Sequence, residues 1–141
     1  MLRVWIHGVC DPNPGGTAAY SVVVKQNLIP LFKKSGVVGA GRGMTSNVAE
    51  YSALIALIEW LEANLIHVPK GREMIRVYSD SELLVNQMNG LWGVHGGAYL
   101  KYYEQASMRL SEVKVEGVPL FNKLKFEYVE PEESTIKEIE W

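Results

Sequence analysis

The segment TSNVAEYSALIALIEWLEANL, residues 45–65, carries the pattern that decides the fold. Over residues 47–65 the apolar side chains recur mostly at steps of three and four, which predicts an amphipathic helix. Glu50 lies at the start of this helix, on the same face as Leu54, Leu57 and Leu61. Because an apolar helix face packs against the rest of the protein, a carboxylate on it needs a partner or a metal ion.

The segments on either side of this helix alternate between strand and helix patterns. Before it, β-rich residues 2–9, 17–25 and 28–39 predict an antiparallel meander, with a loop rich in Pro and Gly at 10–16. After it we expect a strand at 73–79, helices at 81–89 and 99–113, a strand at 124–129 and at most a short helix at 132–141. Residues 115–122 read as a connection. The order predicts an α/β fold: a mixed five-stranded sheet, three antiparallel strands plus parallel strands, flanked by helices.

The length and composition fit one globular domain. At 141 residues, with 21% charged residues, the chain suits a single domain over residues 1–141. No apolar run reaches the roughly 18 residues that a membrane-spanning helix needs. The first residues read as a strand rather than a targeting peptide, and Cys10 alone excludes an internal disulfide and a multi-cysteine zinc site. We therefore expect a monomeric, cytoplasmic protein without membrane association.

The net charge of −2 hides an uneven distribution. Residues 1–126 contain 13 Lys or Arg and 10 Asp or Glu, whereas residues 127–141 contain six Glu and one Lys. Affinity for nucleic acid comes largely from Lys and Arg, which neutralise phosphates. The mild basic balance of residues 1–126 permits nucleic-acid binding without being evidence for it.

Three polar side chains stand where the predicted elements would meet at one edge of the sheet. His7 lies near the end of the first strand, Asp80 follows the strand at 73–79, and Glu50 lies at the start of the long helix. Parallel strands with helical crossovers place sites at their carboxyl ends. Carboxylate oxygens are the ligands that Mg²⁺ prefers, so a metal site is one interpretation.

Each of these residues also has an ordinary structural explanation. Asn47 followed three residues later by Glu50 fits a helix capping box, which spacing alone favours. Asp80 fits the N-cap of the following helix. His7 fits a strand-end histidine bonded to the backbone, and the sequence lacks His or Cys spacings typical of a zinc site.

Three segments together resemble the type 1 ribonuclease H family, in particular its compact archaeal and bacterial members. They are residues 8–16 (GVCDPNPGG), 45–51 (TSNVAEY) and 78–90 (YSDSELLVNQMNG), in the order and spacing of the family. The second and third segments are specific, and the resemblance spans nearly the whole chain. It implies a ribonuclease H-like fold, which agrees with the element order predicted above.

The resemblance implies an enzyme that cuts the RNA strand of an RNA/DNA hybrid by two-metal hydrolysis, leaving a 3′-hydroxyl and a 5′-phosphate. The implied cofactor is Mg²⁺ or Mn²⁺, and the implied catalytic metal ligands are Glu50 and Asp80. Continuing the family pattern toward the end of the chain places Glu138 at its fourth acid, although Lys137 and Ile139 do not match.

The first catalytic aspartate of the family is replaced here by His7. That aspartate bridges both metal ions, whereas a neutral imidazole offers one lone pair and a protonated imidazole none. The replacement also removes a negative charge, which weakens metal binding by roughly a few kcal/mol. Three outcomes stay open. His7 joins Glu50 and Asp80 around a softer ion such as Mn²⁺ or Zn²⁺, Asp11 substitutes for the aspartate, or the domain binds hybrid or a protein partner without cutting.

The resemblance also implies a surface that binds the hybrid. The implied contacts are Asn13, Ser46 and Asn47 with the minor groove and the RNA 2′-hydroxyls, and Thr45, helped by Arg42, with a DNA phosphate. Trp92 would pack against the sugars of the DNA strand, although core packing explains it equally well. The 2′-hydroxyls distinguish RNA from DNA. With few cations, the affinity should be modest and fall with added salt.

Overall fold

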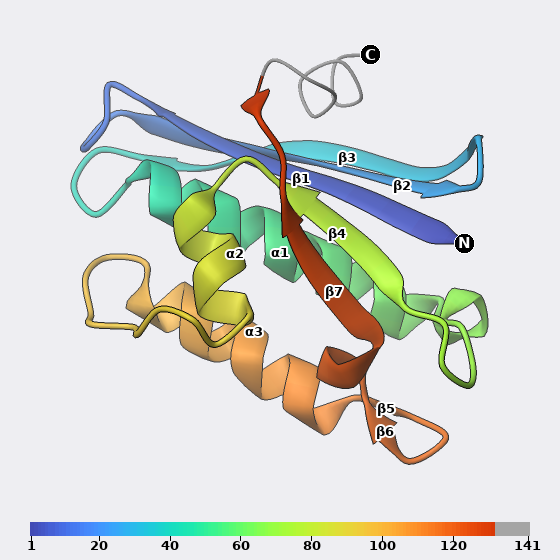
Figure 1. The fold of residues 1–141 in the computed structure, drawn as a ribbon. Helices are drawn as coiled ribbons and strands as arrows, with labels where there is room; N and C mark the ends of the chain where they lie inside the picture. Colours follow the sequence, from blue (N-terminus) through green and yellow to red (C-terminus); the bar gives the residue numbers. More distant parts are fainter. Residues whose placement is uncertain (132–141) are drawn as a thin grey trace.

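One mixed sheet organises the chain. The structure, a computed structural model, describes residues 1–131. Five strands pair in the order β3-β2-β1-β4-β7 (Figure 1). They are β1 (Leu2–Asp11), β2 (Thr17–Gln26), β3 (Ile29–Ala40), β4 (Ile75–Ser79) and β7 (Leu124–Tyr128). The first three pair antiparallel, and β4 runs parallel to β1 and to β7. The predicted mixed five-stranded sheet is confirmed.

The helices pack on one face of this sheet (Figure 1). They are α1 (Ser46–Ala63), α2 (Glu82–Met88) and α3 (Leu100–Glu112). α1 contacts β1 and β2, α3 contacts α1, and α2 contacts α1, β4 and β7. None of the helices described is long and apolar enough to cross a membrane.

Short elements fill the connections. A 3₁₀ turn, η1 (Leu65–His67), follows α1, and a second, η2 (Leu120–Lys123), precedes β7. Between α3 and η2 the chain forms a small hairpin of β5 (Lys114–Val115) and β6 (Val118–Pro119). Residues 115–122, read from the sequence as a connection, therefore contain regular structure.

α1 carries the centre of the core. Its side chains Leu54, Leu57, Ile58 and Leu61 are fully buried. The helix is apolar on more than one face because the sheet covers one side of it and α3 another. The rest of the core comes from alternate positions of the strands, as expected for a sheet with one face buried.

The opposite face of the sheet has a smaller apolar cluster. Trp5 and Tyr78 stack with ring centroids 5.4 Å apart, and Val23 packs beside them. Lys25 Nζ lies 5.7 Å from the Trp5 ring, a cation–π contact. Over residues 1–131 this face has no helix above it (Figure 1).

The helix caps differ from the predicted ones. Thr45 is the N-cap of α1, and its Oγ1 accepts from the Val48 backbone N–H at 3.1 Å. Asn47 is already the second residue of the helix, and Glu50 lies in its second turn, beyond the free amides. The predicted capping box of Asn47 and Glu50 is therefore wrong. The N-cap of α2 is Ser81, whose Oγ accepts from the Leu84 N–H, so the predicted N-cap at Asp80 is wrong as well.

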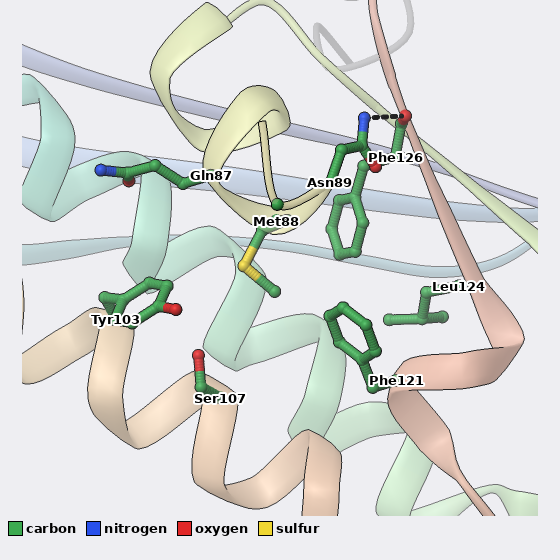
Figure 2. Close-up of a pocket in the computed structure, with 9 residues that line it drawn as sticks. Gln87, Met88, Asn89, Tyr103, Ser107, Phe121, Leu124 and Phe126 are labelled. Carbon is green, nitrogen blue, oxygen red and sulfur yellow. Dashed lines mark hydrogen bonds between the residues drawn. The ribbon is translucent and has the colours of Figure 1, made fainter. Parts of the chain in front are cut away.

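A hollow lies between α2, α3 and β7, with a volume of about 460 Å³. Figure 2 shows its largely apolar wall, to which Met88, Phe121 and Leu124 contribute. Asn89 Nδ2 donates to the Phe126 carbonyl at 3.1 Å and so ties the end of α2 to β7. The hollow lies at the C-terminal end of α2, whereas Asp80 precedes the N-terminal end of that helix.

Candidate functional site

Two strands place His7 beside Asp80. β1 and β4 are parallel neighbours, with Ile6 opposite Ser79. The next residue on each strand is therefore His7 and Asp80, at the same edge of the sheet. His7 Nδ1 lies 3.0 Å from Asp80 Oδ2 and 3.2 Å from Oδ1. The partner of His7 is thus a carboxylate, not the backbone group that the strand-end explanation required.

Gly8 places Glu50 at the same point. α1 crosses β1 so closely that a Cβ at Gly8 would overlap the Glu50 backbone nitrogen and lie 2.5 Å from the Ala49 carbonyl carbon. A glycine permits this close approach of two backbones. The approach brings the Glu50 side chain next to His7, one residue earlier on β1.

Glu50 is the most perturbed acid of the site. Its residue exposure is 6%, and its Oε2 is buried without a hydrogen-bond partner. Burial and the nearby Asp80 charge raise the pKa of Glu50 well above its ordinary value, while a hydrogen bond from the Gly8 N–H acts in the opposite direction. A buried carboxyl with an unused oxygen and a perturbed pKa is typical of functional sites.

His7, Glu50 and Asp80 form a possible metal-binding group, which we call the trio. One nitrogen or oxygen from each lies within 4.8 Å of the others. In the part of the chain that the structure describes, no other His, Cys, Asp or Glu belongs to such a group. Asp11, the possible surrogate, is exposed at the end of β1 and lies outside the trio. An imidazole nitrogen and carboxylate oxygens suit a divalent cation.

The first loop is joined to the start of α1 near the trio. Asn13 Nδ2 donates to Ser46 Oγ, and the Ser46 backbone N–H donates to Asn13 Oδ1, both at 3.1 Å. Thr45 caps the helix, and Asn47 is half-buried in its first turn. These four candidate binding residues therefore lie at one end of the molecule, around the N-terminus of α1.

Trp92 lies on the loop after α2 and is 48% exposed, so core packing does not explain it. Arg42 is exposed before α1. Glu138 lies outside the described residues. The chain leaves the sheet beside Asp80, because the Val129 N–H donates to the Ser79 carbonyl at 3.0 Å.

Sequence reasoning missed a buried polar network of Tyr51, Gln87 and Tyr99. The Tyr51 hydroxyl donates to Gln87 Oε1 at 2.7 Å, and Gln87 Nε2 donates to the Tyr99 hydroxyl at 2.9 Å and to the Gly93 carbonyl at 3.1 Å. The network ties α1, α2 and the start of α3 to the loop that carries Trp92. The sequence signal for this network was Gln87, a polar side chain on the buried face of the short helix α2.

Solved structures with a similar fold are ribonuclease H domains. The N-terminal ribonuclease H domain of Rv2228c from Mycobacterium tuberculosis, a maltose-binding-protein fusion, is 28% identical with a TM-score of 0.74. That match covers 96% of this chain and 86% of the other. LC11-RNase H1, isolated from compost by a metagenomic approach, is 25% identical with a TM-score of 0.76, covering 97% and 89%. The chain is similar in sequence and fold to type 1 ribonuclease H domains.

A curated relative of this chain is much longer. The bifunctional protein Rv2228c of Mycobacterium tuberculosis is 32% identical over 119 residues, which are 84% of this chain and 28% of the relative. A complex of LC11-RNase H1 with an RNA/DNA hybrid is 24% identical and has a TM-score of 0.75, covering 94% of this chain and 87% of the other. No protein-family model matches the chain.

Proposed function

We propose that this ribonuclease H domain binds RNA/DNA hybrids and hydrolyses the RNA strand with the help of a divalent cation. The observation that carries the proposal is the trio, which brings an imidazole together with two carboxylates and includes Glu50, whose buried Oε2 has no hydrogen-bond partner. A bound divalent cation supplies a polarised water and a positive charge opposite the reacting phosphate. His7, Glu50 and Asp80 would hold that ion, which we take to be Mg²⁺ or Mn²⁺.

The residues around the trio would hold the hybrid. Asn13 is exposed beside the half-buried Ser46, and the two would offer amide and hydroxyl groups to the RNA 2′-hydroxyls, which DNA lacks. Thr45, with Arg42 nearby in sequence, would contact a phosphate of the DNA strand. The solved hybrid complex of LC11-RNase H1 shares this fold, which supports the same mode of binding here.

The family's two-ion arrangement fits these residues less well. His7 stands where the family's bridging aspartate would offer one oxygen to each ion, and an imidazole has one lone pair to give. The trio fits a single cation through the unused Glu50 oxygen. We therefore expect slow hydrolysis.

A domain that binds hybrid without cutting is the second candidate. It is favoured by the contact of 3.0 Å between His7 and Asp80, which satisfies the Asp80 carboxylate without a metal ion. We propose a monomeric, cytoplasmic protein for either function, on the basis of its sequence alone.

Cleavage of hybrid with a labelled RNA strand, in Mg²⁺ and separately in Mn²⁺, tests the proposal. We expect slow cleavage that Asp80→Asn abolishes and His7→Asp accelerates. Fluorescence anisotropy with the same hybrid in EDTA measures binding independently. Binding without cleavage by the wild-type protein, together with cleavage by His7→Asp, identifies the second candidate. Absence of both binding and cleavage would contradict both and leave a protein-interaction domain.

A further inference from the structure

We infer that the trio binds one divalent cation, not two, and binds Mn²⁺, Co²⁺ or Zn²⁺ more tightly than Mg²⁺. The inference rests on the proposed function in taking the trio as a cation site, and it adds the number and the class of the ion. The first argument for it is the burial of Glu50 within the trio. Glu50, with 6% of its surface exposed, is one of the three donors and has a buried oxygen without a hydrogen-bond partner.

The charge of the trio matches one ion. If both carboxylates give up their protons to ligate an ion and His7 ligates through a lone pair, the trio carries a charge of about −2, which one divalent cation neutralises. The side chain of Asp80 is 8% exposed and that of His7 is 22% exposed, so the site is shielded from water on most sides. A second divalent ion would leave an uncompensated positive charge there, and burying an unpaired charge is strongly unfavourable.

The donors in the described part of the chain are also too few for two ions. Within residues 1–131 no fourth His, Cys, Asp or Glu places a ligand atom in the group. Glu50 and Asp80 are the two acids of the group. At position 7 the imidazole of His7 stands in place of the family's aspartate, whose two oxygens would bridge the ions. Two neighbouring ions would have to share the Glu50 and Asp80 carboxylates and fill the remaining positions with water.

The kind of donor sets the preference among ions. Mg²⁺ is a hard cation that demands octahedral oxygen ligands and loses its waters reluctantly. Mn²⁺, Co²⁺ and Zn²⁺ accept an imidazole nitrogen, and affinity for a mixed nitrogen and oxygen site rises from Mn²⁺ to Co²⁺. His7 therefore favours these ions over Mg²⁺ in a way that an aspartate at the same position would not.

Direct metal binding tests the inference without any measurement of catalysis. The EDTA-treated protein is titrated with Co²⁺ by calorimetry and visible absorption, and Mg²⁺ and Mn²⁺ are then added as competitors. We expect one Co²⁺ per chain, displaced by an excess of Mn²⁺ and only by a much larger excess of Mg²⁺. Two ions per chain, tighter binding of Mg²⁺, or no binding at all would overturn the inference.

Three variants identify the ligands. His7→Ala should weaken Co²⁺ binding by about tenfold or more and change the absorption bands, since even an outer-shell partner of a metal ligand is worth about that much. His7→Asp should bring Mg²⁺ affinity closer to that of Co²⁺. His95→Ala is the matched control, because His95 is an exposed histidine outside the trio. Circular dichroism melts confirm that each variant is folded, and an unchanged titration with His7→Ala would overturn the assignment of His7.

The two proposals can fail separately. If one Co²⁺ binds with the expected preference but no ion supports cleavage, the inference stands and the proposed hydrolysis fails. If hybrid is cleaved with two bound Mg²⁺ ions per chain, the proposed function stands and the inference fails.

Discussion

Glu50 and Tyr51 are consecutive residues of α1, and each belongs to a buried polar cluster, but the two clusters are completed differently. In the network of Tyr51, Gln87 and Tyr99, each amide and hydroxyl group has a partner at 2.7 to 3.1 Å. In the trio, one oxygen of Glu50 has none, and the pKa of that carboxyl is raised by burial. Buried polar groups are normally paired, so an unpaired one needs an explanation.

The difference separates a cluster that stabilises the fold from one that contains a buried group without a partner. A fully bonded buried network rigidifies the structure, and removing any member leaves the others unsatisfied. A partly bonded cluster destabilises the fold and persists where something binds. Substitutions in the network should therefore lower stability, whereas substitutions in the trio should alter binding and chemistry.

The largest effect is expected from Asp80→Asn. The change removes a carboxylate charge while keeping the shape of the side chain. If the domain cuts hybrid, we expect cleavage to fall by about 100-fold or more, about 3 kcal/mol of transition-state stabilisation. Stability should change little. Quenched-flow or gel assays of labelled hybrid measure the rate, and an undiminished rate would remove Asp80 from the site.

A smaller effect, on stability, is expected from Gln87→Leu. The hydroxyls of Tyr51 and Tyr99 would lose their common partner while remaining buried. An unsatisfied buried group costs about 1 to 3 kcal/mol, so we expect the free energy of unfolding to fall by about 2 kcal/mol. Gln105→Leu is the control, since Gln105 is exposed on α3 and should change stability by less than about 0.5 kcal/mol. Urea denaturation compares the two variants, and equal stabilities would show that the network is dispensable.

Glu50→Gln should raise stability in the absence of metal, by about 1 kcal/mol near neutral pH, because it removes a buried charge. The folded pKa of Glu50 lies above its unfolded value near 4.5. The folded protein therefore binds the proton more tightly, and stability is lost as the pH rises from the unfolded value through the folded one. Glu50→Gln should flatten this part of the pH profile. A wild-type melting temperature that rises over the same interval relative to the variant would contradict the assignment.

The smallest effect is expected from Trp92→Ala. Trp92 is half-exposed, so its removal should leave stability nearly unchanged. If it packs on the sugars of the DNA strand, hybrid affinity should fall by about threefold, roughly 0.7 kcal/mol of lost apolar contact. Fluorescence anisotropy in EDTA separates this effect from metal binding. Leu91→Ala, at a more exposed apolar neighbour, tests whether the loss belongs to Trp92 itself.

The sequence predicted the sheet and the helices because apolar periodicity follows burial directly. It did not predict the cap of α1, since Thr45, Ser46 and Asn47 are all competent capping residues. The choice depends on the extended backbone at Thr45, with φ of −143°. The hairpin of β5 and β6 was missed because its turn is Glu116-Gly117, both with positive φ, where Asn-Gly or Asp-Gly would have been recognised.

The site could be predicted in part. The resemblance to the family placed Glu50, Asp80 and His7 together, and their side chains do meet in the structure. The contact between His7 and Asp80 depends on the parallel register of β1 and β4, which no local pattern encodes. The network around Gln87 was out of reach for the same reason, because its three members come together only through the packing of separate helices.

The close approach at Gly8 constrains the geometry of the proposed cation site. Main-chain atoms of β1 and α1 rest against each other there, so the donors on the strand and the helix cannot spread or close freely. In the proposed cation site the backbone therefore sets the spacing of the donors. A fixed spacing of the donors would select ions by their radius. A single methyl group added at position 8 would change this spacing without replacing any ligand.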